Sequence, residues 1–522
     1  MKSKSNKNRK NKQGFIHFLI GKDQYFDWLL LVIVCLAGYL VVKSGYPYPI
    51  TMSDSGGYIQ AAKTDMFSFY RPFGYSVLLQ LIHTLSSSIH AIFIVQMLLY
   101  FISASIFAFT VKYFFAPAKK IVWYFLLFFF VFSPMAFILA NAIMSDLLFG
   151  IVIYIMLASF IFIVKQGKWI ALITFLLAVF CSLYIRYSAM VFPVIFLFCF
   201  LWLRGKIRWI SIAGLVIVSV IFYNQMKDLM KETTEFDQFS TGFDGWQLAN
   251  NAMHILPFID LDSQKISDKK MRELHQFSLP YKDTILESTN HGSTTTVSFL
   301  WDPAFPLKMF VYEEMRKQQR SYAHLWIELG TTTFKEYGQY LILRYPWKFM
   351  RYYYFPNMKH VFFLYNPGII SSETSITTAE AYEWYKIDES QDLTLKNPFY
   401  KGIIWNFMQV LWTLRWIFIL GLSLWAVLWR KRIKYNNADK IVFWSLFVFG
   451  AIYYASTVFA SPIEDRYWFP TECILFSFCY ILCNKLVLCM QSNSLKNNQE
   501  QAVISNEKPV IPKQKKGKKN IR

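Results

Sequence analysis

The chain has 522 residues, of which 55% are hydrophobic, 19% aromatic and only 17% charged. A soluble domain carries about 25% charged residues, so the composition argues against an ordinary soluble fold and indicates a membrane environment. The formal net charge is +21, but the excess lies mainly in short connections and the two tails. This distribution argues against a nucleic-acid-binding face.

Apolar runs of helical length recur along the chain and predict an all-α polytopic membrane protein with about ten spans, since a helix needs roughly 20 residues to cross the hydrocarbon core. A basic segment, residues 1–24, precedes the first run. No small-residue cleavage site follows that run, so we interpret it as a retained span and not as a signal peptide. The predicted spans are 25–43, 89–111, 120–139, 146–164, 169–183, 188–203, 209–224, 408–429, 441–460 and 468–489.

Basic residues alternate between the two sides of these spans. The connections KYFFAPAKK, KQGK, RGKIR and RKRIKYNNADK are rich in Lys and Arg, whereas NAIMSD, YIRYS and SPIEDRY carry at most one Arg each. Lys and Arg mark the cytoplasmic side of short loops. We therefore expect a multi-pass protein of the inner or plasma membrane with both termini cytoplasmic. The basic tail 491–522 is expected to be disordered and drawn to anionic lipid.

The first outer loop, residues 44–88, carries the first candidate for chemistry. Asp54 lies a dozen residues past the first span, and the glycines that follow it let the backbone approach a ligand closely. Its carboxylate suits a general base, and the alternative is that it caps the helix that follows. Residues 75–88 have one apolar stripe, at Leu78, Leu81, Ile82 and Leu85, so we expect an interfacial helix there and not an eleventh span.

Five further charged residues extend this pattern. Asp146 begins a span and is either a second catalytic acid or a helix cap. Arg71, Arg186 and Arg466 lie in outer loops and suit a phosphate, because a guanidinium offers two parallel donors. For Arg186 and Arg466 the alternative is that an interfacial arginine simply extends its charged group to the membrane surface. For Arg466 a salt bridge to Glu464 or Asp465 is a second alternative. Arg415 lies inside an apolar run, where a charge suggests function, and is assigned to the same phosphate.

The second large unit is the outer loop 225–402, which is long enough for a small domain. It separates an N-terminal membrane module, residues 25–224, from C-terminal membrane helices, residues 403–490. The sequence predicts one helix near 307–329, and an aromatic run at 352–363 that lies on the bilayer.

Three side chains are candidates for sugar binding. Trp246 offers a ring on which a sugar can stack, and Asn250 and the adjacent Asn251 offer amides that can hydrogen-bond to it. Tyr58 of the first loop is also assigned to substrate binding. The alternative that we favour for the loop segment is a capped helix packed on the membrane face. His254 is expected to be packed and not a ligand.

Metal and cofactor signals are weak. All seven cysteines lie within apolar runs, and no CxxC or HExxH pattern occurs, so neither a disulfide framework nor a zinc site is indicated. No cofactor is assigned. Asp54 and Asp146 are the carboxylates available to share a divalent cation.

Taken in order, several motifs resemble the GT-C class of polyprenyl-phosphate-sugar glycosyltransferases, which includes the protein mannosyltransferase and lipid A aminoarabinose transferase branches. The resembling motifs are SDSGGYIQAA, YRPFGYSVLLQLIH, MSDLL, RYSAMVFP and EDRYWFP. Two departures stand out: many relatives have two adjacent acids in the first loop, where this chain has Ser53-Asp54-Ser55, and the large loop precedes the eighth span.

The resemblance implies a helical membrane core with interfacial helices and an inverting enzyme. Asp54 matches the acidic catalytic residue of the family. The donor would be a sugar on a polyprenyl phosphate or diphosphate. The acceptor would be a glycan, lipid or protein on the extracytoplasmic face, with no nucleic acid involved.

Other functions stay open at this point. A transporter or flippase of lipid-linked glycans would need charged groups along a path through the helices. A glycan polymerase or ligase would share the donor chemistry. A non-catalytic envelope scaffold would use the loop only to bind a partner.

Overall fold

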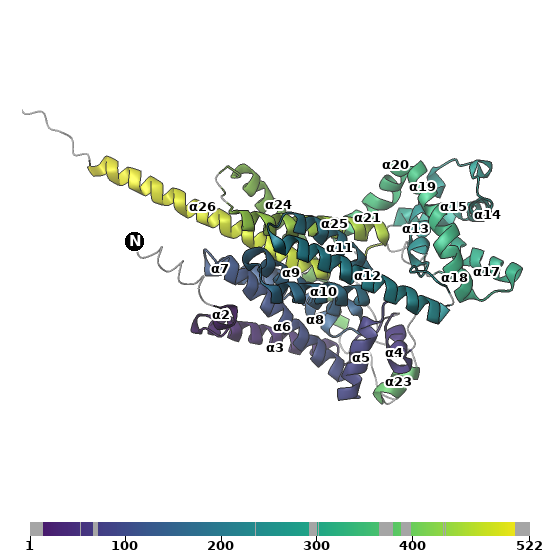
Figure 1. Cartoon of the computed structure of the whole chain (residues 1–522), viewed down its shortest axis with the longest axis horizontal. Coiled ribbons are helices and arrows are strands. Elements are labelled where there is room, and N and C mark those ends of the chain that lie inside the picture. Colours follow the sequence, from purple (N-terminus) through teal and green to yellow (C-terminus); the bar gives the residue numbers. More distant parts are fainter. Residues whose placement is uncertain are drawn as a thin grey trace, which may run out of the picture.

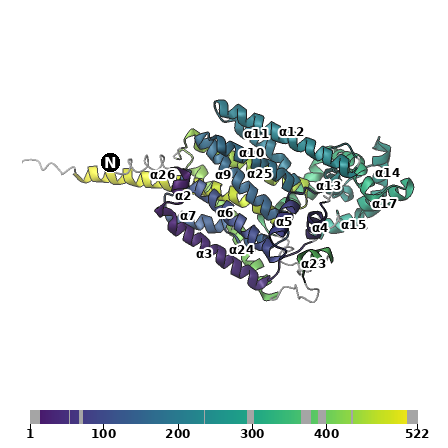
Figure 2. The same ribbon diagram turned by 60° about the horizontal axis from the view of Figure 1, so that its bottom comes forward.

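The structure, a computed structural model, describes residues 14–506 except 53, 66–70, 235, 292–299, 301, 365–378, 388–397, 432 and 434. The described residues form helices and no strands, with one isolated parallel bridge between Ile50 and Ala142. Long helices run side by side in a bundle, and the helices of the large loop gather at one end of it (Figure 1). Helix α2 (Phe15–Leu19) and the polar part of α26 lie at the opposite end (Figure 2).

Seven helices are long and apolar enough to cross a membrane, which makes the chain a multi-pass membrane protein. They are α3 (Tyr25–Gly45, preceded by η1, Lys22–Gln24), α6 (His90–Phe114), α9 (Ser145–Gln166), α12 (Lys206–Thr234), α24 (Pro398–Leu428), α25 (Asn437–Ala460) and α26 (Glu472–Asn506, preceded by η9, Asp465–Thr471). Two shorter apolar helices, α10 (Trp169–Ile185) and α11 (Val191–Leu201), follow α9. Every predicted span falls on one of these helices or on the broken segment described next.

The predicted span 120–139 lies where the sequence placed it, but it is not one continuous helix. It consists of α7 (Lys120–Leu126), η2 (Leu127–Val131) and α8 (Pro134–Ala140), bent by 42°. Pro134 has no backbone N–H to continue the preceding helix, and it starts a new helix at the first position, where that N–H is not needed. Counting the bent pair as one span raises the total among the described residues to eight.

The first outer loop holds two short helices, α4 (Ser55–Thr64) and α5 (Gly74–Leu85). Helix α5 has 12 residues, fewer than the roughly 17 that a span needs, so it is not an eleventh span. Of its predicted apolar stripe, Ile82 is buried against the bundle, whereas Leu81 and Leu85 are 58% and 84% exposed, and its place in the membrane interface stays a prediction.

The large loop forms its own hydrophobic core, distinct from that of the membrane helices. Its bounds differ from 225–402, because α12 continues to Thr234 and α24 already begins at Pro398. The predicted helix over 307–329 is two helices, since Gln319 adopts a left-handed conformation and ends the first. The loop helices are α13 (Phe243–Met253), α14 (Lys269–Ser278), α15 (Lys282–His291), α17 (Pro306–Gln318), α18 (Tyr322–Leu329), α19 (Lys335–Arg344), α20 (Pro346–Phe349), α21 (Phe355–Phe362) and α23 (Ala379–Tyr385).

The C-terminal tail differs from the prediction. Helix α26 runs on to Asn506, so the expectation of disorder after residue 491 is wrong over 492–506. A helix that is already nucleated by a span extends by one hydrogen bond for each residue fixed. Residues 507–522 lie outside the described residues.

Ion pairs sort the helix ends into two sets. At one end, Lys112 of α6 pairs with Asp27 of α3, and Lys165 of α9 and Lys485 of α26 both pair with Asp439 of α25. The basic connections after α6 and α9 and before α25 therefore meet at this end, as the alternation predicts. The charged residues of the outer loops, among them Asp54, Asp146, Arg186 and Arg466, lie at the other end. Which side of the membrane each end faces stays a prediction.

Candidate functional site

A cavity of about 650 Å³ lies between this second end of the bundle and the large loop. Its membrane side includes five of the predicted site residues: Asp54, Tyr58, Arg71, Arg186 and Arg466. Its loop side carries polar side chains from α13, α19 and the turn before α13: Ser240, Thr241, Asp244, Gln247 and Lys335.

Asp54 sits at the start of α4 on a backbone that is fixed from both sides. The hydroxyl of Ser55 accepts from the N–H of Met52 and donates to the carbonyl of Ile143, each at 2.8 Å. The Asp54 side chain makes no hydrogen bond to the first turn of α4. The capping alternative is therefore wrong here, and the carboxylate is directed elsewhere.

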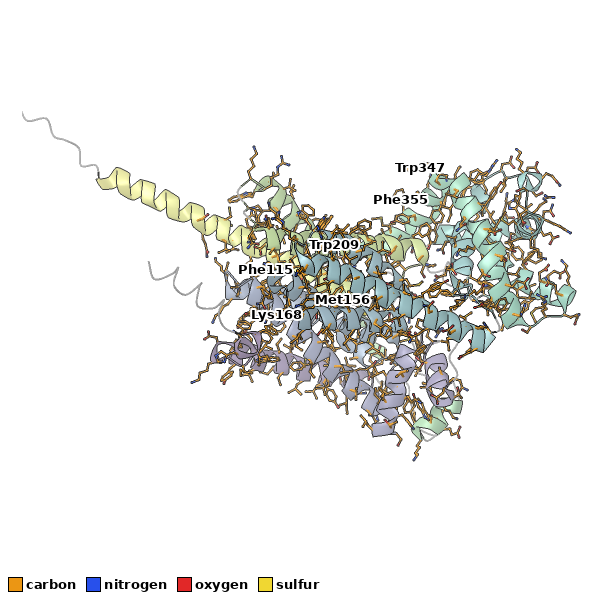
Figure 3. All side chains as sticks on the ribbon, in the orientation of Figure 1. Phe115, Met156, Lys168, Trp209, Trp347 and Phe355 are labelled. Carbon is orange, nitrogen blue, oxygen red and sulfur yellow. The ribbon has the colours of Figure 1, made fainter. Side chains whose placement is uncertain are left out.

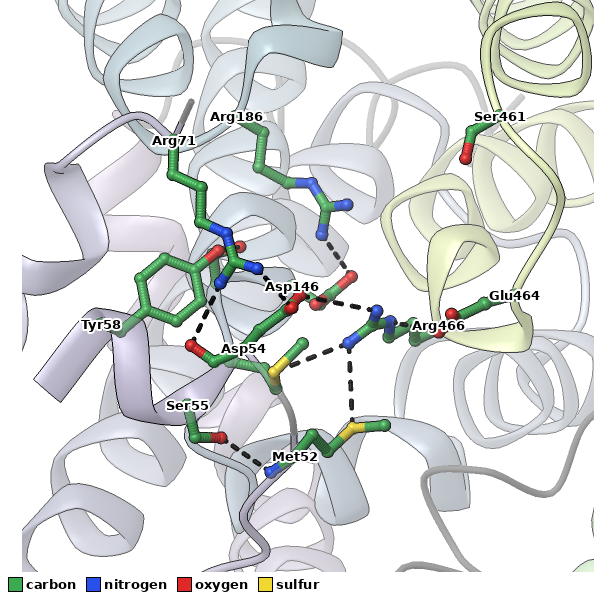
Figure 4. Close-up of polar contacts among 12 residues, drawn as sticks. Met52, Asp54, Ser55, Tyr58, Arg71, Asp146, Arg186, Ser461, Glu464 and Arg466 are labelled. Carbon is green, nitrogen blue, oxygen red and sulfur yellow. Dashed lines mark hydrogen bonds and ion pairs between the residues drawn. The ribbon is translucent and has the colours of Figure 1, made fainter. Parts of the chain in front are cut away.

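That carboxylate faces two guanidinium groups (Figure 4). Arg71 Nη2 lies 2.5 Å from Asp54 Oδ1, and Arg71 Nη1 donates to the Asp54 carbonyl at 3.1 Å. Arg466 Nη2 lies 3.8 Å from Asp54 Oδ2. Burial raises the pKa of Asp54, but Arg466 and then Arg71 lower it by more, so the pKa lies below the ordinary value of 3.8. Asp54 is consequently ionised at neutral pH, as a base must be.

Tyr58 lies one helical turn further along α4, beside the same guanidinium. Its hydroxyl donates to Ser145 Oγ at 3.0 Å, and Arg71 lies 5.4 Å from its ring centroid. Burial, and next the charge of Asp54, raise the pKa of this phenol. Tyr58 is therefore a neutral wall of the cavity, in reach of a ligand.

Asp146 and Arg186 form a second pair. Asp146 lies in the first turn of α9, makes no cap bond and is completely buried. It forms an ion pair with Arg186 Nη1, while Arg186 lines the cavity and Asp146 does not. Burial lowers the pKa of Arg186, but Asp146 and next the neighbouring tyrosines together raise it by more, so this guanidinium stays charged. The geometry suits Asp146 to holding Arg186 in place and gives no support to direct catalysis by Asp146.

Arg466, just before α26, is the third arginine of a charged cluster that also contains the pairs Asp54–Arg71 and Asp146–Arg186. Its Nε lies 2.8 Å from Glu464, so the predicted salt bridge to a neighbouring acid is confirmed. Its Nη1 contacts the sulfur atoms of Met52 and Met144 at 3.8 and 3.6 Å. Three guanidinium groups thus face three carboxylates, and the cluster is electrically neutral as a whole.

Arg415 lies apart from this cavity, on α24. It pairs with Glu472 at 2.8 Å and donates to the carbonyl of Phe129, and Ser133 donates to the second Glu472 oxygen at 2.6 Å. The void beside it has a volume of about 10 Å³, too small for a substrate. The prediction that Arg415 binds the donor phosphate gains no support from this placement.

Trp246 and Asn250 face the core of the large loop. The Trp246 ring stacks on Trp326 with centroids 3.9 Å apart, and its Nε1 donates to the Trp326 carbonyl at 3.0 Å. Asn250 is fully buried and donates to Asn251. His254 is buried as well, which lowers its pKa to about 3. The structure supports the packing alternative, since neither Trp246 nor Asn250 lines the cavity.

The loop side of the cavity was not predicted from the sequence. Asp244 accepts from Ser240 Oγ at 2.5 Å and lies 3.0 Å from Lys335 Nζ. Gln247 follows Asp244 by three residues on the same exposed edge of α13. The signal was present, because this spacing places the two polar side chains on one helix face, opposite the apolar one.

The charges do not suit a shared cation. Asp54 and Asp146 are each bonded to an arginine, and a divalent ion placed between them would meet guanidinium groups. Among the described residues, no group of three or more His, Cys, Asp or Glu residues could hold a metal. Arg71, Arg186 and Arg466 line the cavity, so its charged donors suit an anionic group and not a cation.

The fold and the site together define a multi-pass helical membrane protein with a large charged cavity at one end of its bundle. Comparisons with protein-family models, curated proteins and solved structures find no match to this chain. Its function is therefore argued from the cavity and its residues.

Proposed function

We propose that the chain is a membrane glycosyltransferase of the GT-C type, which moves a sugar from a polyprenyl phosphate or diphosphate to an envelope glycan, lipid or protein. The observation that carries this proposal is the cavity in which Asp54 faces Arg71 and Arg466 and which Arg186 also lines. A carboxylate base beside several fixed guanidinium groups suits the transfer of a group from a phosphate.

The proposed step uses these groups in one displacement. The acceptor hydroxyl attacks the anomeric carbon while Asp54 takes its proton. The bond between the anomeric carbon and the phosphate oxygen breaks, and the polyprenyl phosphate leaves with the electron pair. Attack from the side opposite the leaving group inverts the configuration. The guanidinium groups stabilise the charge that grows on the phosphate, and Tyr58 and the polar loop side of the cavity contact the sugar.

The proposal includes a topology. The bent segment and the shorter helices α10 and α11 also cross, which gives ten spans. Both termini are then cytoplasmic, and the cavity faces the extracytoplasmic side of the inner or plasma membrane. The gathering of Lys112, Lys165 and Lys485 at the far end supports this orientation, because basic residues stay on the cytoplasmic side.

Transport of a lipid-linked glycan is the main rival. It needs polar groups along a path through the bundle, whereas the charged cluster lies at one end. The buried pair Arg415–Glu472 is enclosed beside a void of only about 10 Å³. These observations favour transfer over transport. A polymerase or ligase would differ from the proposal only in the acceptor.

The test is release of polyprenyl phosphate by the purified, lipid-reconstituted protein from a panel of polyprenyl-phosphate-linked sugars. We expect release from at least one donor, and its loss when Asp54 is replaced. Movement of an intact donor between leaflets without release would favour the transporter. Neither release nor movement with any donor, by protein that melts cooperatively, would contradict both.

A further inference from the structure

Residues 335–363 form a helical arm of the large loop, composed of α19, α20, the turn η8 (Met350–Tyr354) and α21. One side of this arm is buried and packs on the rest of the protein: Leu341, Phe349, Tyr353, Asn357 and Val361. The opposite side, which we call the outward stripe, is exposed. It repeats every four residues: Leu343, Trp347, Arg351, Phe355, Lys359 and Phe363.

The apolar members of the outward stripe are unusually open. Trp347 is 69% exposed, and Leu343 and Phe363 are 80% and 60% exposed. They come from separate turns of the exposed side, where Arg351 and Lys359 alternate with them, and together they form a strip of apolar and basic side chains. The rings of Trp347 and Phe355 lie 6.3 Å apart within it. Figure 3 shows Trp347 and Phe355 close together at the outer edge of the molecule. A strip of this kind marks an interaction surface.

Cations lie within this strip and beside it, and the strip contains no acid. Arg344, Lys348, Arg351 and Lys359 lie between residues 337 and 363, a segment without a single Asp or Glu. The first three lie over tyrosine rings of the arm. No ion pair joins any of the four to a carboxylate within the described part of the chain. Their charges therefore remain available to an anionic partner.

The arm is fixed to the spans at its far end. Trp412 of α24 donates to the carbonyl of Val361 at 3.1 Å, and Trp468 donates to that of His360 at 3.0 Å. The ring of Phe362 lies 5.0 Å from that of Trp416 in α24. Because α21 is bonded to helices that cross the membrane, the outward stripe begins at the edge of the bundle, where lipid surrounds the protein. In Figure 1, α20 and α21 extend sideways from the bundle at this point.

We propose that the outward stripe lies in the membrane interface and binds anionic phospholipid headgroups. Aromatic and aliphatic side chains of an amphipathic helix enter the boundary between headgroups and acyl chains, and flanking Lys and Arg hold the phosphates. The absence of acids between residues 337 and 363 makes the preference one for anionic lipid over zwitterionic lipid. This inference does not rest on the proposed sugar transfer.

The experiment uses the full chain in nanodiscs of zwitterionic lipid, with or without anionic phosphatidylglycerol. Spin labels are attached to single cysteines that replace Trp347 or Phe355, in a cysteine-free background. The matched control is Arg316→Cys, on α17, whose side chain is 80% exposed and which belongs to no apolar strip. Collision of each label with oxygen, which partitions into lipid, is compared with collision with a water-soluble nickel chelate.

At positions 347 and 355 we expect oxygen to be favoured over nickel, and the reverse at 316. Anionic lipid should deepen the labels at 347 and 355, and the variant Arg344→Gln/Lys348→Gln/Arg351→Gln should remove that dependence on anionic lipid. Labels at 347 and 355 that prefer nickel would overturn the proposal. Shielding from both reagents, with coupling between labels on two copies, would instead identify a dimer interface. Labels that sit in lipid but ignore its charge would overturn the headgroup assignment.

Discussion

Asp54 is the residue on which the proposed chemistry depends, and a single substitution isolates it. Asp54→Asn keeps the size of the side chain but cannot accept a proton. Because the carboxylate caps no helix, α4 should stay intact. We expect the rate of sugar transfer to fall by about 10²–10⁴-fold, measured as polyprenyl phosphate released.

Asp65→Asn is the matched control for this substitution. Asp65 ends the same helix, and its carboxylate accepts from Gln80 Nε2 at 2.8 Å, away from the cavity. Asparagine also tolerates the left-handed backbone found there. We expect this variant to transfer sugar at the wild-type rate. If the two variants behave alike, Asp54 is not the base.

Arg71 should set the pH range in which Asp54 works. Its positive charge helps to hold the pKa of Asp54 below 3.8, against the effect of burial. In Arg71→Gln, that opposition is weaker, so the pKa of Asp54 rises. We expect the acid limb of the kcat/KM profile to move to higher pH. An unmoved limb in a variant of reduced but measurable activity would show that another group titrates.

For single residues, the sequence predicted the end of the bundle at which each candidate lies better than it predicted the side chain that each one contacts. Asp54, Arg71, Arg186 and Arg466 meet because the alternation of basic loops placed them all on one side. What could not be predicted is which carboxylate each arginine engages, since Arg186 and Asp146 are brought together only by the packing of α9 on α10. For Trp246, burial depended on a partner, Trp326, that lies 80 residues away.

Two asparagines of the large loop cap α25. Asn251 donates to the carbonyls of Phe459 and Ala460, at 3.0 and 3.1 Å. Asn357 donates to those of Val458 and Ser461 and accepts from the N–H of Ile463. The last carbonyls of a helix have no partner within it. These amides therefore join the loop to the turn that leads to Arg466.

Replacing Asn357 with Ala should loosen that turn. The substitution leaves two buried carbonyls and one N–H without their partner, which costs about 1–3 kcal/mol for each group that stays unsatisfied. We expect a lower melting temperature and slower transfer, because Arg466 is no longer held. A wild-type melting curve for the Ala variant would contradict the capping role.

The pair Arg415–Glu472 connects α24 to α26 inside the bundle. Arg415→Met leaves a buried carboxylate without its counter-ion, which typically costs about 3–5 kcal/mol. The double variant Arg415→Met/Glu472→Met should regain much of this loss. Thermal melting measures both. Transfer per folded molecule should be unchanged in the double variant, and a large loss there would return Arg415 to the donor site.

The helices themselves were largely predictable, and the exceptions have local causes. The break in 120–140 could have been predicted, because Pro134 stands in the middle of that run. The length of α26 could not have been predicted, because its C-terminal part is polar and shows no apolar residues at helical spacing. The packing of α13 against α19 could not have been predicted either. It depends on contacts between segments far apart in the sequence, and the hydrophobic periodicity of one helix carries no information about them.

For the molecule as a whole, the two ends of the bundle should differ in their access to reagents. Cysteines placed at Ser88, between α5 and α6, or at Arg316 should react with an impermeant thiol reagent in intact cells. Cysteines at Gln166 and Asn437, beside the basic connections, should react only after permeabilisation. All four positions are exposed in the structure. Labelling of Gln166 or Asn437 from outside would invert the proposed topology.

The neutrality of the arginine–carboxylate cluster has a kinetic consequence. A polyprenyl phosphate-linked sugar brings one negative charge, whereas the free polyprenyl phosphate that remains carries nearly two at neutral pH, because its second pKa is about 6. The same guanidinium groups that assist bond breaking therefore bind the product more tightly than the donor. We expect a rapid burst of about one sugar per enzyme molecule, followed by a slower steady rate set by product departure.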